Sequence, residues 1–76
     1  MIDQIIDIME EIFQKDIKEM EHDQITPLNI ETWDSLMHLN LIVSIEDEFD
    51  MDFDADEIAL MNDGLESILK IIESKL

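Results

Sequence analysis

The sequence predicts an all-α fold, a small four-helix bundle with three longer helices and one short third helix. Apolar residues recur at spacings of three and four along most of the chain, and no stretch alternates as a strand would. The only proline, Pro27, and the only glycine, Gly64, fall between the periodic segments. At 76 residues the chain is a single domain, 1–76, near the lower size at which one core folds unaided.

The first helix is predicted from an amphipathic pattern of about four turns or more. Its apolar face comprises Ile2, Ile5, Ile6, Met9, Ile12 and Phe13. The segment 23–33, "DQITPLNIETW", follows as a long loop in which Pro27 stops helix growth. We expect three apolar side chains of this loop to pack on the core, namely Ile25, Leu28 and Ile30.

The second helix is predicted to begin at Ser35 and to end near Phe49. Asp34 suits the cap position, and Trp33 and His38 then occupy the positions that a hydrophobic staple joins. At about 100° per residue, one arc of this helix would face the core, comprising His38, Leu41, Ile42, Ile45 and Phe49. A second arc, here named the apolar arc, consists of Leu36, Leu39 and Val43. Only one of the two arcs is needed for folding.

The third and fourth helices each follow a polar start. In "DADEIALM" (54–61), Asp54 and Glu57 have the spacing of a capping box, and this segment predicts the short helix. Asp63 and Glu66 repeat that spacing before the last helix, which ends in lysines that suit a helix C-terminus. The apolar stripe of the last helix comprises Leu65, Ile68, Leu69, Ile72 and Leu76.

Composition excludes several classes of function. The chain has 21 acidic residues, four lysines and no arginine, a net charge of −17, so it would repel nucleic acid and anionic membranes and attract basic protein surfaces. It has no cysteine, which excludes disulfides and thiolate metal sites. The start "MIDQIIDIMEE" is acidic and lacks a signal peptide pattern, and no apolar run reaches membrane-spanning length. We therefore expect a cytoplasmic monomer.

The sequence suggests a calcium-binding loop and a catalytic site, but the residues present do not support either one. The acidic stretch "DMDFDADE" resembles a calcium loop, but neither the frame from Asp50 nor that from Asp52 has glycine at position six, so no specific metal site is predicted. Asp34, Ser35 and His38 could suggest catalysis. However, one turn of a surface helix offers no cleft, and His38 belongs to the core arc. We therefore expect no enzymatic activity.

Ser35 is better explained as a site on which another protein acts. A phosphodiester there would be anionic and would lie at the positive end of the helix dipole. The apolar arc lies beside it, with acidic residues further along the same helix, an arrangement that resembles a docking face.

The sequence resembles the acyl carrier protein family, the phosphopantetheine-binding carriers, over essentially its whole length. The resemblance rests on "DSL" at 34–36, the following helix "LMHLNLIVSIEDEFD", and the acid-rich loop with its short third helix. It implies that Ser35 carries 4′-phosphopantetheine, with Asp34 in a supporting role, and that a phosphopantetheinyl transferase installs it. The thiol of that arm would hold acyl or aminoacyl groups as thioesters, which would explain the missing cysteines.

The resemblance also implies partners, namely acyl-loading and acyl-transferring enzymes with basic and apolar docking surfaces. We expect them to dock on Leu36, Met37, Leu39, Asn40, Val43 and Asp47. Many carriers of fatty acid synthesis have acids where this chain has Met37 and Asn40, and a small residue where it has Trp33. A dedicated carrier for a polyketide or other specialised acyl pathway therefore fits at least as well as fatty acid synthesis. The alternative is an acidic non-enzymatic binding module, a divalent-cation buffer or nucleic-acid mimic.

Overall fold

A computed structural model describes residues 1–76 of the protein as four α-helices and one 3₁₀ turn, with no strand. The elements are α1 (Ile2–Phe13), the turn η1 (His22–Gln24), α2 (Ser35–Phe49), α3 (Ala55–Met61) and α4 (Leu65–Lys75). The predicted all-helical bundle with a short third helix is confirmed. No helix has the length and apolar character needed to cross a bilayer.

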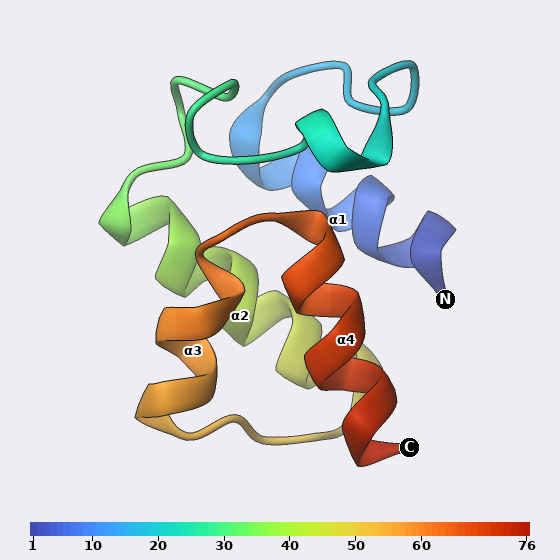
Figure 1. Ribbon diagram of the computed structural model, residues 1–76, viewed down its shortest axis with the longest axis vertical. Helices are drawn as coiled ribbons and strands as arrows, with labels where there is room; N and C mark the ends of the chain where they lie inside the picture. Colours follow the sequence, from blue (N-terminus) through green and yellow to red (C-terminus); the bar gives the residue numbers. More distant parts are fainter.

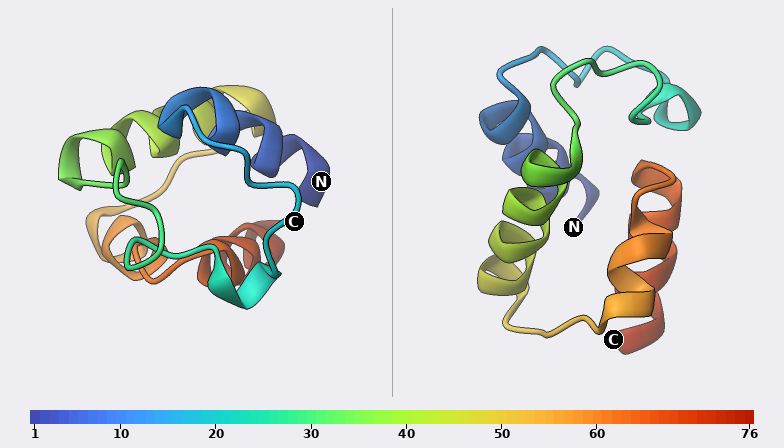
Figure 2. Two further views of the ribbon diagram at one scale, coloured as in Figure 1. Left: turned by 90° about the horizontal axis from the view of Figure 1, so that it is seen from above. Right: turned by 90° about the vertical axis from the view of Figure 1, so that its left-hand side faces the viewer.

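The helices form two layers (Figures 1 and 2). α1 packs on α2, and α3 packs on α4. The segment 14–34 runs over one end of both layers, with η1 against α4, and the segment 50–54 connects the layers at the other end (Figure 2). Ser35 begins α2 where the first of these segments ends.

The core lies between the layers and uses one face of each long helix. In α2 the predicted core arc is confirmed, because Leu41, Ile42, Ile45 and His38 are buried and Phe49 is half-buried against them. In α4 three of the five predicted stripe residues are buried and Leu69 is half-buried, but Leu76 lies exposed beyond the last turn. The first helix is shorter than predicted, with 12 residues.

The long segment 14–34 is mostly exposed, but a few of its apolar side chains belong to the core. Ile17, Ile25 and Ile30 are fully buried in it, and burying each such side chain contributes about 1.5–3 kcal/mol. The prediction for Leu28 is wrong. Its side chain is 96% exposed, because it lies in the tight turn in which the amides of Asn29 and Ile30 bond to the carbonyl of Thr26.

Caps set the helix boundaries. The capping box of α3 is confirmed: Asp54 accepts from the amide of Glu57, and Glu57 accepts from the amide of Asp54. The second predicted box is wrong, because Gly64 caps α4 with no side-chain bond. Gly64 has φ 138°, and the amide of the next residue donates to the carbonyl of Ile25 at 2.9 Å. A Cβ at Gly64 would lie 2.8 Å from that carbonyl, so this junction requires glycine.

Candidate functional site

The start of α2 is organised by Asp34. Its backbone is extended, and its Oδ1 accepts a hydrogen bond from the amide of Met37 at 2.8 Å, so Asp34 is the N-cap and Ser35 is the first residue of the helix. The capping role predicted for Asp34 is confirmed.

The Ser35 side chain is exposed, and its hydroxyl makes no hydrogen bond within the protein. The hydroxyl of a serine at a helix start usually accepts a hydrogen bond from a backbone amide of the first turn. Here the carboxylate of Asp34 accepts that bond instead. The amides of Ser35 and Leu36 also have no partner in the chain. A nucleophilic oxygen therefore stands in solvent beside two free donors at the positive end of a 15-residue helix.

His38 does not act as a base for Ser35. Its imidazole is buried, and both nitrogens are in use. Nδ1 accepts from the indole Nε1 of Trp33 at 3.0 Å, and Nε2 donates to the carbonyl of Ile58 at 2.8 Å. The structure therefore does not assemble Asp34, Ser35 and His38 into a proton relay. The Trp33–His38 contact predicted as a staple is present, and it is a hydrogen bond with stacked rings.

The apolar arc lies on the outer surface of α2. Leu36, Leu39 and Val43 are 63%, 52% and 56% exposed, which is far more than their folding role would require. The two-faced character predicted for α2 is therefore present in the structure. Glu46 and Glu48 do not lie free beside this arc, since they bond to the amide of Phe53 and the side chain of Gln4.

The other three predicted docking residues, Met37, Asn40 and Asp47, lie outside the apolar arc. Met37 is half-buried and packs against the core, and its sulfur accepts a contact from the side-chain Nδ2 of the exposed Asn40 at 3.8 Å. Asp47 is exposed on the side that faces α1. It lines a hollow between the two helices together with Ile8, Glu11, Ile12, Ser44 and Glu48.

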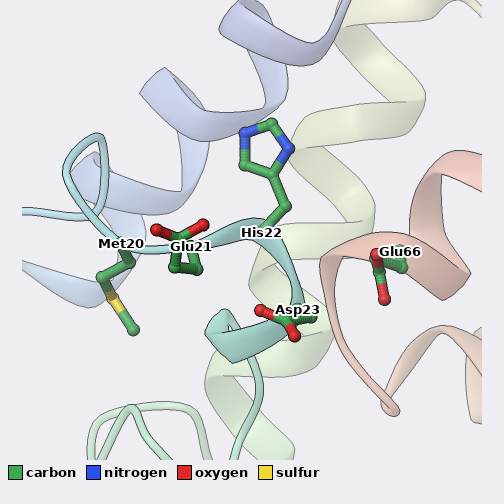
Figure 3. Close-up of a pocket in the computed structure, with 5 residues that line it drawn as sticks. All are labelled: Met20, Glu21, His22, Asp23 and Glu66. Carbon is green, nitrogen blue, oxygen red and sulfur yellow. The ribbon is translucent and has the colours of Figure 1, made fainter.

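Another hollow lies between η1 and α4. Its lining is mostly polar, but the polar side chains do not point toward one common position. Its lining consists of Met20, Glu21, His22, Asp23 and Glu66 (Figure 3). The ring of His22 points away from the carboxylates of Asp23 and Glu66 in that view. No three His, Asp or Glu side chains of the protein come together in a way that could hold a metal ion.

Sequence reasoning missed one partner of this region, Ile58 on α3, whose carbonyl is bonded to His38. A backbone carbonyl carries no sequence signal, so only the packing of α3 could show it. Comparisons of the chain with protein families, curated proteins and solved structures find no match.

Proposed function

We propose that the protein is an acyl carrier, holding acyl or aminoacyl groups as thioesters on a 4′-phosphopantetheine arm attached to Ser35. The observation that carries this proposal is the exposed, unbonded hydroxyl of Ser35 at the first position of α2, next to a cap supplied by Asp34. The resemblance of "DSL" and the surrounding helices to carrier proteins supplies the chemistry.

The residues around Ser35 suit a phosphodiester. The free amides of Ser35 and Leu36 can donate to its oxygens, and the dipole of α2 favours negative charge at this end. The Asp34 carboxylate lies nearby, but its bond to the amide of Met37 keeps it in the cap. In the attachment step the Ser35 Oγ loses its proton and forms a bond to the pantetheine-bearing phosphorus of coenzyme A. The pyrophosphate bond to that phosphorus breaks, and adenosine 3′,5′-bisphosphate leaves.

The arm would supply a thiol that the chain itself lacks, since it has no cysteine. The protein's own residues would then provide attachment and docking. A transferase or acyl-loading enzyme with a basic surface would be attracted by the net charge of −17 and would cover the apolar arc beside Ser35. The pathway we propose is a specialised one, because Met37 and Asn40 leave the helix less acidic near Ser35.

The test is attachment to a single residue. The protein is incubated with coenzyme A and a phosphopantetheinyl transferase of broad specificity, and its intact mass is measured. We expect the parent to gain one phosphopantetheine, Ser35→Ala to gain none, and Ser44→Ala, a matched change on the same helix, to behave as the parent. No gain in the parent, or a gain that persists in Ser35→Ala, would refute the proposal.

A further inference from the structure

The imidazole of His38 is the point at which three parts of the molecule meet. It is 5% exposed and bonds to the indole of Trp33, in the segment before α2, and to the carbonyl of Ile58, on α3. The latter is the only hydrogen bond between α2 and α3. Trp33 is also buried, and its ring stacks on Phe13 of α1 with centroids 4.9 Å apart.

The bond to Ile58 completes the C-terminus of α3. The last four carbonyls of a helix lack partners within it. Here the carbonyls of Ala59, Leu60 and Met61 accept from the amides of residues 62, 63 and 64 through short turns. Ile58 is left out of that series, and the His38 Nε2–H supplies its partner at 2.8 Å.

The two partners fix which ring nitrogen carries the proton. A carbonyl only accepts, so Nε2 must donate to Ile58, and an indole only donates, so Nδ1 must accept from Trp33. A second proton on Nδ1 would place two N–H donors 3.0 Å apart. The bond to Ile58 would survive, because Nε2 of the charged ring still donates to the carbonyl. A positive charge is also favoured there, since this carbonyl belongs to the C-terminal end of the α3 dipole.

Most of the charged groups on the surrounding elements are carboxylates, and no charged side chain bonds to the ring. Asp34 is held by the amide of Met37, and Glu57 pairs with Lys75 at 3.0 Å. Lys18 and Lys75 pair with carboxylates and not with the ring. The carboxylates on these elements are Asp3, Asp7, Glu10 and Glu11 on α1, Glu31 and Asp34 before α2, Glu46, Asp47 and Glu48 on α2, and Asp54, Asp56 and Glu57 at the start of α3.

We propose that His38 is a proton-sensitive positioning residue: in its neutral form it fixes Trp33 and the start of α2, and protonation of Nδ1 releases Trp33 while α3 stays attached. Trp33 is two residues from Ser35, so release would loosen the chain that presents the hydroxyl. This second consequence rests on the proposed function, whereas the release of Trp33 does not.

The release can be observed directly, because the chain has one tryptophan and two histidines. In a His22→Gln background, any imidazole titration belongs to His38. We expect the ¹⁵N-indole signal and the fluorescence of Trp33 to change between pH 7.5 and 5.5, because a proton on Nδ1 displaces the indole N–H that bonds there. The unfolding equilibrium constant in urea should rise about tenfold over the same range, the effect of one buried hydrogen bond.

Three variants in this background separate the two bonds. His38→Gln keeps a donor for Ile58 but cannot titrate, so its Trp33 signals should be independent of pH and should resemble the released form. His38→Asn keeps an acceptor for Trp33 and should resemble the neutral form at both pH values. Trp33→Phe retains an aromatic ring against Phe13 but removes the donor, so acid should no longer weaken the fold.

The outcomes are distinct. A pH response of Trp33 that persists in His38→Gln, or acid weakening that is unchanged in Trp33→Phe, would overturn the inference. Attachment of phosphopantetheine at pH 7.5 and 5.5 forms a separate measurement, with Ser35→Ala as the blank. If the Trp33 signals respond as expected but Ser35 is never modified, the switch stands and the proposed function fails.

Discussion

Glu10 and Glu46 occupy equivalent places at the ends of α1 and α2. In each case the backbone carbonyl accepts the amide of a left-handed residue four positions on, Gln14 or Asp50. Each carboxylate accepts the amide seven positions on, that of Ile17 at 2.7 Å or Phe53 at 3.0 Å. One glutamate thus satisfies the helix end and directs the next apolar side chain into the core.

The Glu10 carboxylate accepts more hydrogen bonds than the Glu46 carboxylate. It also accepts from the amide of Lys18 at 3.0 Å and from the Lys18 Nζ at 2.7 Å. The Lys18 side-chain bond, followed by the amides of Ile17 and Lys18, lowers the pKa of Glu10 from 4.5 to about 2. The bonds to Asp7 and Glu10 raise the pKa of Lys18 above its ordinary value of 10.5.

The lowered pKa of Glu10 predicts a pH dependence of stability. A carboxyl whose pKa is lower in the folded state stabilises the fold above its unfolded value of 4.5, and this contribution is lost as pH falls toward 2. Glu10→Gln should therefore unfold at lower urea concentration at pH 6 and should show a flatter pH profile between 4.5 and 2. Glu11→Gln is the control, since the Glu11 carboxylate makes no hydrogen bond. Identical profiles for the two variants would contradict the prediction.

The residue scale also shows where sequence reasoning succeeds and fails. Asp34, Ser35 and the α3 capping box could be located because capping depends on neighbours within one turn. The cap of α4 could not, because Gly64 is required by the carbonyl of Ile25, distant in sequence. Leu28 was misplaced because helical periodicity says nothing about side chains in a turn.

At the scale of the element, α2 has one arc that packs in the core and a second, apolar arc that is exposed. Its bounds, Ser35–Phe49, and its two arcs follow from the sequence alone, since both depend on local caps and on the helical period. Whether the outer arc binds a partner cannot be predicted in the same way, because the partner lies outside the chain. What the structure adds is that Leu36, Leu39 and Val43 contribute little to the core.

The Val43 side chain offers the sharpest test of the docking face. It is 56% exposed and lies two turns beyond Ser35. Val43→Asp should leave the helical circular dichroism and the melting temperature nearly unchanged. It should reduce the kcat/KM of the transferase or of an acyl-loading enzyme tenfold or more, because burying one such side chain contributes about 1.5–3 kcal/mol and about 1.4 kcal/mol corresponds to a factor of ten.

A matched control for Val43→Asp is Lys70→Gln, an exposed change on α4. Like Val43→Asp, it makes the net charge more negative by one, but it does not touch α2. If Val43→Asp unfolds the protein, Val43 belongs to the core, and if it stays folded and reacts at the parent rate, the docking face lies elsewhere.

At the scale of the whole molecule, the apolar core stabilises the fold, and repulsion among the many negative charges around it opposes folding. The core of 16 buried apolar residues includes four from the segment 14–34, which ties the two layers together. Around it lie 21 acidic residues, and the two lysines in ion pairs, Lys18 and Lys75, neutralise few of them. Repulsion among the remaining carboxylates therefore weakens the folded state at low ionic strength.

This balance predicts how stability responds to salt. Raising NaCl from about 10 to 150 mM shortens the screening length from about 30 to 8 Å and should raise the melting temperature by several degrees. A few millimolar MgCl₂ or CaCl₂ should achieve the same at much lower ionic strength, and a chelator should reverse it. Because the carboxylates do not converge on one point, the two ions should act alike and without fixed stoichiometry. A tight, stoichiometric calcium effect that magnesium cannot reproduce would instead show a specific site in the acidic segment 50–57. Equal melting temperatures under all conditions would show that charge repulsion does not limit the stability of this fold.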